Sequence, residues 1–229
     1  MSKIELSKVN FTYPGSSEPV LEDFSVTLDT TWKTGLIGRN GRGKTTLLTL
    51  LSGKNRPDSG KVALSCPAKY FPPAVEDTDL TGEELFSTLT LDCPEWKFRR
   101  ELNLLGMGED VLYRPFFTLS GGEQTKLLLG ALFCQEEGFL LIDEPTNHLD
   151  GQGRETVARY LKGKSGFVLV SHDRDFLDGC VDHILALNPT GPELQAGNFS
   201  SWWENKQRRD QFELEQNQTL KKEIKKLNQ

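Results

Sequence analysis

Long apolar runs are absent from this sequence. The longest, such as Phe139 to Ile142 and Phe167 to Val170, have the length of a β-strand. A helix that crosses a membrane needs about 18 or more apolar residues. We therefore expect no membrane span.

A secretory signal and a cysteine framework are lacking as well. The segment from Met1 to Leu6 does not have the basic-then-apolar order of a signal peptide. The cysteines form no Cys-x-x-Cys pair, so we expect neither a zinc site nor disulfides. They are Cys66, Cys93, Cys134 and Cys180. Together these features predict a cytoplasmic protein.

An excess of basic residues is also missing. The chain has 27 Lys and Arg against 33 Asp and Glu, which gives a formal net charge of −6. This balance excludes a globally basic nucleic-acid binder but allows a local basic patch. With 229 residues, 36% of them hydrophobic, the chain can bury a substantial core, and we expect one large domain with an appendage.

The order of apolar segments predicts an α/β fold. Alternating residues around Ile4 to Leu6 and Phe24 to Leu28 indicate half-exposed strands, and thus an antiparallel β subdomain. Continuous apolar runs later in the chain indicate buried parallel strands, with helices expected between them. We expect strands at 35–37, 61–65, 139–142, 167–170 and 184–187, and helices at 44–51, 154–161 and 173–180.

The pattern changes to helical segments between Thr81 and Gln135. Thr81-x-x-Glu84 and Ser120-x-x-Glu123 both have the spacing of a capping box, and Gly106 can end the middle helix. We expect a helical subdomain at about 79–137, inserted in a main α/β domain of residues 1–200. Residues 201–229 would begin a helical linker.

A glycine-rich segment between the first expected parallel strand and its helix is the strongest chemical signal. Gly38-Arg39-Asn40-Gly41-Arg42-Gly43-Lys44-Thr45 fits the phosphate-loop pattern G-x-x-x-x-G-K-[ST]. The glycines let backbone N–H groups surround a phosphate at a helix N-terminus. Lys44 would bridge the β- and γ-phosphates of ATP, and Thr45 would offer its hydroxyl to Mg²⁺. The nucleotide is expected to contact Gly38, Asn40, Gly41, Gly43, Lys44, Thr45 and Thr46.

Two carboxylates follow the apolar strand that begins at Phe139. Open α/β sheets bind their ligands at the carboxyl ends of strands, where Asp143 and Glu144 stand. Two acids after a strand, taken alone, are most often the start of a solvated loop. Joined to the phosphate loop, they predict that Asp143 holds Mg²⁺ through water and that Glu144 orients and deprotonates the attacking water.

A six-residue string ahead of this strand narrows the choice among families of nucleotide-hydrolysing proteins. It reads Leu119-Ser120-Gly121-Gly122-Glu123-Gln124. It resembles the signature sequence of ATP-binding-cassette (ABC) ATPases. The resemblance implies that Ser120, Gly121 and Gly122 reach across a dimer to the γ-phosphate bound by a second cassette. A simple helix cap would explain Ser120 and Glu123 but would not require the paired glycines.

Further positions extend the resemblance along the chain. His172 matches the family's switch histidine, which contacts the γ-phosphate and the catalytic carboxylate. Leu149-Asp150 matches the loop that communicates between paired cassettes. Tyr13 stands where the family stacks an aromatic ring on adenine, and the alternative is an ordinary strand aromatic.

The string from Glu144 to Asp150, Glu-Pro-Thr-Asn-His-Leu-Asp, resembles the ABC-F branch. Members of this branch carry two cassettes on one chain and act on ribosomes. The phosphate loop and the stretch Ser201 to Lys206 further resemble the antibiotic-resistance subgroup that protects ribosomes. The implied partners are a second cassette and the ribosome, including its RNA and tRNA.

The C-terminal tail adds one physical feature to that reading. Leu220, Ile224 and Leu227 have helical spacing and would pack on a second linker helix. A set of bases could approach ribosomal RNA through its phosphates, or could be a solvated helix face, because acidic residues are interleaved with them. The bases are Arg208, Arg209, Lys221, Lys222, Lys225 and Lys226, and the acids are Glu213, Glu215 and Glu223.

One departure from the family pattern concerns the metal site. The family usually has a glutamine after the strand near Lys69 to Phe71, and its side-chain oxygen joins the Mg²⁺ shell. Here the chain reads Tyr70-Phe71-Pro72-Pro73-Ala74, without glutamine. The protein would then supply only Thr45 and, indirectly, Asp143.

Two other functions remain open from the sequence. The chain could be the ATPase subunit of a membrane transporter, although the Asn147-His148-Leu149 string and the charged C-terminal helix oppose this. It could also be a binding module that uses ATP only to hold two cassettes together, although Glu144 and His172 favour hydrolysis.

Overall fold

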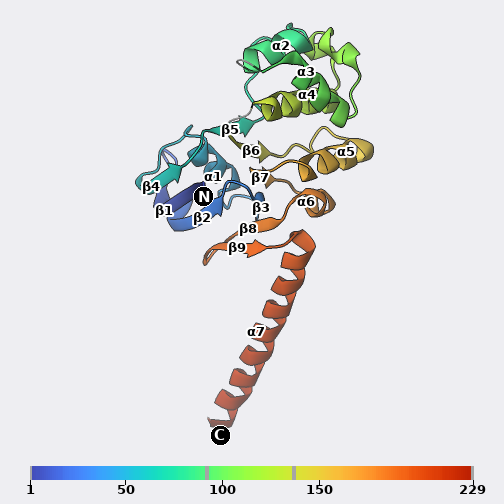
Figure 1. The fold of residues 1–229 in the computed structure, drawn as a ribbon. Coiled ribbons are helices and arrows are strands. Elements are labelled where there is room, and N and C mark those ends of the chain that lie inside the picture. The colour runs from blue at the N-terminus through green and yellow to red at the C-terminus, as the bar shows by residue number, and fades with distance from the viewer. Residues whose placement is uncertain (1, 91–92, 136–137, 228–229) are drawn as a thin grey trace.

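The computed structural model describes residues 2–90, 93–135 and 138–227, without the side chains of residue 213 and residues 217–227. It confirms the expected α/β class, with two sheets and a group of inserted helices (Figure 1). Most of the tail side chains singled out in the sequence lie outside this description. They are those of Glu213, Leu220, Lys221, Lys222, Glu223, Ile224, Lys225, Lys226 and Leu227.

The smaller sheet is antiparallel and has the order β2-β1-β4. Its strands are β1 (Lys3–Phe11), β2 (Leu21–Asp29) and β4 (Ser59–Leu64). Ile4 and Leu6 are buried while their neighbours are exposed, as the alternation predicted.

The larger sheet has the order β5-β6-β7-β3-β8-β9, and neighbouring strands are parallel except for β8 and β9. The strands are β3 (Lys33–Gly38), β5 (Ala68–Phe71), β6 (Phe139–Asp143), β7 (Phe167–Val170), β8 (His183–Asn188) and β9 (Gly191–Ala196). The apolar runs of β6 and β7 are buried, as expected for strands covered on both faces.

Two cores cover the two faces of this sheet. Helix α1 (Lys44–Leu51) and the smaller sheet pack on the face that carries Leu141 and Val168. Helices α5 (Gly151–Lys162) and α6 (Arg174–Cys180) lie on the opposite side, where Leu169 is buried. Successive side chains of a strand point to opposite faces, so each buried strand contributes to both cores.

Three helices stand between β5 and β6 and form the upper lobe in Figure 1. They are α2 (Gly82–Leu89), α3 (Glu95–Leu104) and α4 (Gly121–Cys134), with 3₁₀ turns at Glu109–Leu112 and Phe116–Thr118. Both predicted capping boxes are present, at Thr81 and Ser120. Helix α3 ends just before Gly106, whose φ of +67° suits glycine.

Strand β9 was not expected from the sequence. It pairs with β8 as an antiparallel hairpin at the edge of the sheet. Of its residues Gly-Pro-Glu-Leu-Gln-Ala, only Leu194 is a large apolar residue, so the alternation that marks a strand is missing.

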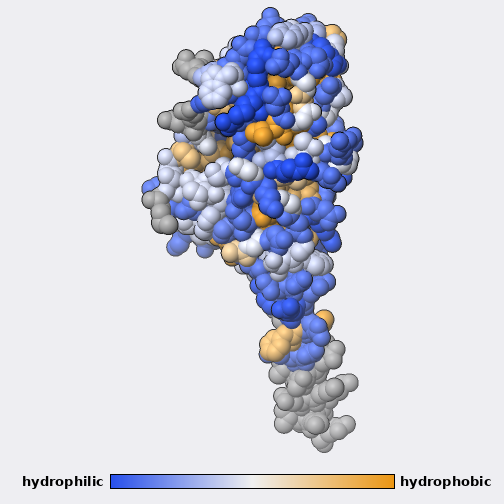
Figure 2. All heavy atoms as spheres, turned by 45° about the vertical axis from the view of Figure 1, so that its right-hand side comes forward, coloured by the Kyte–Doolittle hydropathy of each residue, from blue (hydrophilic) through white to orange (hydrophobic). Residues whose placement is uncertain are grey.

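Helix α7 (Phe199–Leu227) follows β9 and projects from the body (Figure 1). Its first turns pack through Phe199 and Trp202, which are buried. Figure 2 shows a mostly hydrophilic face with separate apolar patches. Among the described residues, no helix is long and apolar enough to cross a membrane.

A buried carboxylate joins the inserted helices to α5 and the residues after it. Glu101 of α3 is 4% exposed. Its Oε2 accepts a hydrogen bond from the Tyr160 hydroxyl at 2.6 Å and pairs with the Lys164 ammonium. Burial and the neighbouring Glu101 both raise the pKa of Tyr160, so its hydroxyl stays protonated and keeps donating.

Replacing Tyr160 by Phe should lower the free energy of unfolding. The change removes the hydroxyl and leaves a buried carboxylate with one donor fewer, which costs about 1.5–3 kcal/mol for a hydrogen bond to a charged group. The control is Tyr113→Phe, because the Tyr113 hydroxyl accepts from Arg99 on an exposed side chain. It should cost less than about 0.5 kcal/mol. Equal losses in chemical denaturation would contradict this account of Glu101.

Candidate functional site

The phosphate-loop segment connects β3 to α1 at the carboxyl edge of the larger sheet. Gly41 and Gly43 adopt φ values of +80° and +86°, a conformation that residues with a Cβ rarely take. A Cβ on Gly43 would also stand 2.9 Å from Val20 Cγ1. Glycine is therefore required at Gly43 by both backbone conformation and space.

A pocket of about 400 Å³ opens above this segment. We call it the phosphate-loop pocket. It brings together most of the residues predicted to bind nucleotide, with Val20 and Val170 as further lining. The predicted residues in it are Tyr13, Asn40, Gly41, Gly43, Lys44, Thr45, Thr46, Asp143, Glu144 and His172.

Two oxygen-bearing side chains meet at the base of the pocket. Thr45 Oγ1 donates to Asp143 Oδ2 at 3.3 Å. No group of three or more His, Cys, Asp or Glu side chains that could hold a metal occurs among the described residues. A hydroxyl and one carboxylate nevertheless fit Mg²⁺, which prefers oxygen ligands and completes its shell with water and phosphate oxygens.

Glu144 stands directly beside this pair in an unusual backbone conformation. Its φ is +47°, and its amide donates to Val170 O at 2.9 Å. Its Oε1 is buried and lacks a hydrogen bond within the described chain, although His172 Nε2 lies 3.2 Å away. The His172 amide donates to Oε2 at 3.3 Å. An unsatisfied buried carboxylate oxygen is suited to accept a proton from water.

Lys44 and Tyr13 lie at two further walls of the pocket. The Lys44 ammonium donates to Gly38 O at 2.9 Å, which holds it against the loop. The Tyr13 hydroxyl and Thr46 Oγ1 share a hydrogen bond of 3.0 Å. The Tyr13 side chain is 42% exposed, so one part of its ring can receive a ligand.

Gly38, Ser120, Gly121, Gly122 and Asp150 do not line the phosphate-loop pocket. Ser120 starts α4, and its amide and hydroxyl both donate to Glu123 Oε2, at 2.7 and 2.8 Å. These bonds are the main reason why the pKa of Glu123 lies below its usual value. Asp150 caps α5 by accepting from Gly153 N at 2.7 Å.

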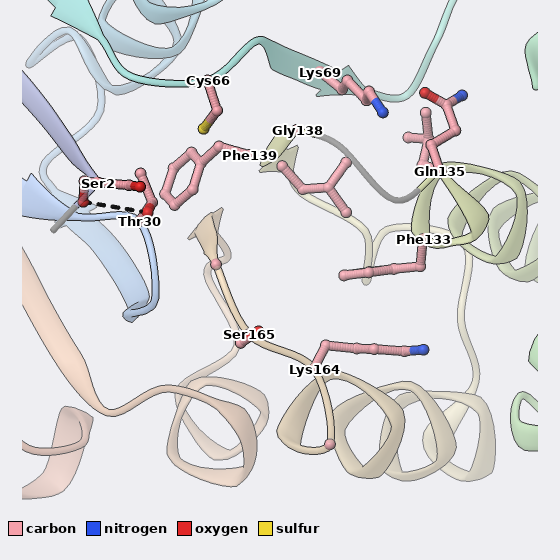
Figure 3. Close-up of a pocket in the computed structure, with 14 residues that line it drawn as sticks. Ser2, Thr30, Cys66, Lys69, Phe133, Gln135, Gly138, Phe139, Lys164 and Ser165 are labelled. Atoms are coloured by element: carbon pink, nitrogen blue, oxygen red, sulfur yellow. Dashed lines mark hydrogen bonds between the residues drawn. The ribbon is translucent and has the colours of Figure 1, made fainter.

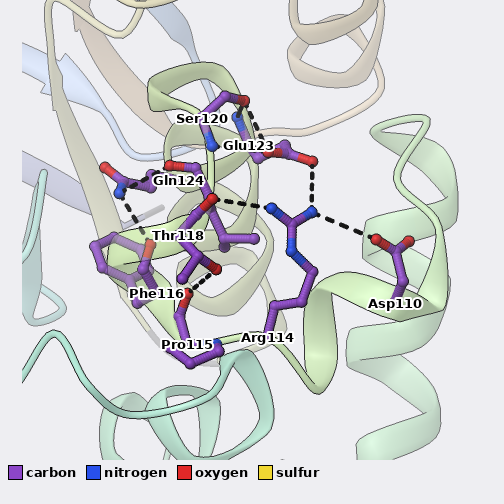
Figure 4. Close-up of polar contacts among 9 residues, drawn as sticks. Asp110, Arg114, Pro115, Phe116, Thr118, Ser120, Glu123 and Gln124 are labelled. Carbon is purple, nitrogen blue, oxygen red and sulfur yellow. Dashed lines mark hydrogen bonds and ion pairs between the residues drawn. The ribbon is translucent and has the colours of Figure 1, made fainter.

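Arg114 supports the start of α4 from the neighbouring turn (Figure 4). It lies 3.4 Å from Glu123 Oε1 and 3.5 Å from an Asp110 carboxylate oxygen, and it donates to Thr118 O at 2.9 Å. The guanidinium thereby offsets the negative charge of Glu123 beside Ser120. Sequence reasoning identified Ser120 and Glu123 but missed Arg114, which has no recognisable motif.

The paired glycines have a structural reason as well. A Cβ on Gly121 would stand 2.9 Å from His148 Cβ, and one on Gly122 would stand 3.2 Å from His148 O. The start of α4 therefore packs directly on the loop that follows Glu144. This contact joins the Ser120 segment to the loop that leads from Glu144 to Asp150.

A second hollow of about 420 Å³ lies at the opposite end of the strands (Figure 3). Phe139 and Gly166, where β6 and β7 begin, line it, together with Lys69 and Lys164. None of the predicted site residues is among its lining residues. Ligands of open α/β sheets bind at the carboxyl ends of strands, so the phosphate-loop pocket is the candidate site.

Tyr70 is a contact of Asp143 that the sequence did not reveal as functional. Its hydroxyl donates to Asp143 Oδ2 at 2.6 Å. Burial and the neighbouring carboxylate raise the pKa of Tyr70. What brings the two side chains together is the position of Tyr70 on β5, because β5 lies next to β6 in the sheet.

Comparison with known proteins assigns the family. A family profile described as ABC transporter matches residues 21–147, more than half of the chain. The chain therefore belongs to the ABC transporter family, as the resemblance predicted, and is an ATP-binding domain of that family.

Two curated relatives match most of the chain. The Putative ATP-binding protein YdiF of Bacillus subtilis is 35% identical over 203 residues, covering 86% of this chain and 31% of that protein. ABC transporter F family member 3 of Arabidopsis thaliana is 33% identical over 190 residues, covering 79% and 26%. The chain thus spans about a third or less of the length of these relatives.

A solved structure supports the fold. The dimeric structure of a post-hydrolysis state of the ATP-binding cassette MJ0796, bound to ADP and Pi, has a TM-score of 0.70 to this chain. The two are 18% identical, and the match covers 84% of this chain and 98% of that one. The fold of an ATP-binding cassette is therefore shared.

Changing Lys44 to Ala should abolish most of the thermal stabilisation that MgATP gives to this chain. The change removes the ammonium held at the rim of the phosphate-loop pocket, and stabilisation by a ligand follows its affinity. Tyr13→Ala should reduce the MgATP-induced rise in melting temperature less, because stacking on one aromatic ring contributes only modestly to the affinity. Melting curves with and without MgATP measure both effects. An unchanged shift in Lys44→Ala would refute the assignment of the phosphate loop.

Proposed function

We propose that this chain is the ATP-binding and ATP-hydrolysing cassette of a cytoplasmic ABC-F protein. The observation that carries the proposal is the convergence of Lys44, Thr45, Asp143, Glu144 and His172 on one pocket at the carboxyl edge of the sheet. Residues 1–200 would form the cassette, with the helical subdomain at about 79–137. Residues 201–229 would begin the linker to a second cassette.

The chain's own residues divide the work of phosphoryl transfer. Lys44 and the loop amides would hold the β- and γ-phosphates of ATP and stabilise the charge that develops on them. Mg²⁺, held by Thr45 and through water by Asp143, would neutralise charge on the phosphate oxygens. Glu144 would take a proton from the water that attacks the γ-phosphorus while ADP leaves. His172, 3.2 Å from Glu144 Oε1, would contact the γ-phosphate and orient the carboxylate.

A second cassette would complete the site. Ser120, Gly121, Gly122 and Asp150 lie outside this chain's own phosphate-loop pocket, which supports a role toward nucleotide bound by a partner. Two cassettes meeting head to tail would each give a signature segment to the other. ATP turnover would then drive the opening and closing of the pair of cassettes.

Hydrolysis by the isolated chain should be slow and should rise more than linearly with protein concentration. The reason is that two chains must associate before Ser120 of one reaches the nucleotide of the other. Glu144→Gln should bind ATP and fail to turn it over, because the amide cannot accept the proton from water. Phosphate release measured across a dilution series tests both statements. Fast turnover that is strictly proportional to protein would show that one cassette is complete.

The ribosome is the proposed partner. The protein would act either in antibiotic resistance by ribosomal protection or as a translation factor. Support comes from the resemblance of residues 144–150 to the ABC-F branch and from a relative named as a member of the F family. In the described part of α7, Arg209 pairs with Glu193 at 2.5 Å and Arg208 lies 4.0 Å from Glu204. The contact with RNA phosphates would therefore rest on the lysines further along the helix.

The helix that begins the linker adjoins the site. A third hollow, of about 570 Å³, shares Lys44 and His172 with the phosphate-loop pocket and is lined on one side by Trp202 and Trp203 of α7. The Arg174 guanidinium lies 5.1 Å from the centre of the Trp203 ring. The start of the linker therefore lines a hollow that borders the phosphate-loop pocket.

A protein that contains this cassette with Glu144→Gln should sediment with 70S ribosomes in an ATP-dependent and salt-sensitive manner. Salt sensitivity is expected because contacts with phosphates release counterions. Less protein should sediment with the ribosomes when glutamine replaces Lys221, Lys222, Lys225 and Lys226. Equal recovery with and without ATP, or association with membranes alone, would instead support the ATPase subunit of a transporter.

A further inference from the structure

The strand that leads into the inserted helices ends beside the metal-binding end of β6. Strands β5 and β6 are parallel, with Tyr70 opposite Leu141. Tyr70 and Leu141 belong to the same core, and Asp143 lies two residues beyond Leu141 on the same face. The long Tyr70 side chain can therefore pass Leu141 and reach the carboxylate of Asp143.

The contact between Tyr70 and Asp143 is short and charge-assisted. The separation of 2.6 Å between the hydroxyl and Oδ2 is typical of an O–H donor facing a carboxylate. The ring is half-buried, and the Lys54 ammonium lies 3.9 Å from its centre. Tyr70 is thus held from two sides, by a cation on its face and by a carboxylate at its hydroxyl.

Among the described residues, both hydrogen bonds to the Asp143 side chain end on one oxygen. Oδ2 accepts from both Tyr70 and Thr45, at 2.6 and 3.3 Å. In the part of the chain that the structure describes, no hydrogen bond reaches Oδ1. The two donors fix the rotation of the carboxylate and leave its other oxygen for the shell of a cation.

We infer that Tyr70 is a positioning residue for the metal site, orienting Asp143 through its hydroxyl. This inference rests on the proposed function of the pocket as a MgATP site. It also gives a role to the place where the chain departs from the family pattern, because no glutamine follows β5. Tyr70 supplies instead a direct link from β5, the strand that enters the inserted helices, to the carboxylate that would hold the metal.

The test compares nucleotide binding with and without Mg²⁺ in Tyr70→Phe. This variant keeps the ring and removes only the hydroxyl. A fluorescent ATP analogue, titrated in excess EDTA, should bind the wild-type chain and the variant equally, within about twofold. In Mg²⁺, the gain in affinity should fall about tenfold in the variant, the lower end of what lost support of a metal ligand costs.

Two control variants separate orientation from general damage. Tyr113→Phe removes a hydroxyl from an exposed ring in the inserted helices and should leave both affinities unchanged. In an Asp143→Ala background, Tyr70→Phe should have no further effect on the Mg²⁺-dependent gain, because the oxygen that accepts from Tyr70 is gone.

The outcomes distinguish this inference from the proposed function. An unchanged Mg²⁺-dependent gain in Tyr70→Phe overturns the inference and leaves the nucleotide site intact. An equal loss of affinity in EDTA and in Mg²⁺ also overturns it, because the tyrosine would then support only the fold. If the wild-type chain binds the analogue under neither condition, the proposed function itself fails.

Discussion

The parallel pairing of β6, β7 and β3 is the constraint on which the site depends. Val170 of β7 lies opposite Asp143 of β6 on one side and Leu36 of β3 on the other. Its carbonyl accepts the Glu144 amide at 2.9 Å. Because these strands end together, the loop after β3 and the acids Asp143 and Glu144 at the end of β6 meet at one edge. A shift of register in β7 would separate the phosphate-binding residues from the carboxylates.

Around this edge, the chain uses different interactions for different tasks. Backbone conformation shapes the loop, through positive φ at Gly41 and Gly43. Hydrogen bonds orient Asp143, whereas Glu144 keeps a buried oxygen without one. The oriented group suits a metal ligand and the unsatisfied group suits a proton acceptor. Neighbouring carboxylates can thus have different roles because their environments differ.

The start of α4 is likewise held by a combination of polar contacts and close backbone packing. Ser120 caps α4 and donates through its amide to Glu123, and Arg114 offsets the charge of Glu123. Gly121 and Gly122 let His148 approach, so the segment that would face a partner's nucleotide packs on the loop after Glu144. The Ser120 segment is therefore joined by direct packing to the loop that follows Glu144.

Much of this arrangement could be predicted from the sequence. The phosphate loop, the apolar runs of β6 and β7 and both capping boxes have local patterns, so their elements and most pocket residues followed directly. Strand β9 could not be predicted because it lacks apolar alternation and depends on pairing with β8. Arg114 and Tyr70 escaped notice for a related reason. Each acts through a partner on a different element, nine residues away for Arg114–Glu123 and 73 away for Tyr70–Asp143. Only the packed fold brings these pairs together.

The most direct test of the central claim is hydrogen exchange of the chain with and without MgATP. The account predicts slower amide exchange in residues 38–46 and 143–144, where the loop and the carboxylates meet. It predicts no change in residues 163–166, which line the hollow at the other end of the strands. Protection confined to that hollow, with the phosphate loop unaffected at saturating MgATP, would contradict the account.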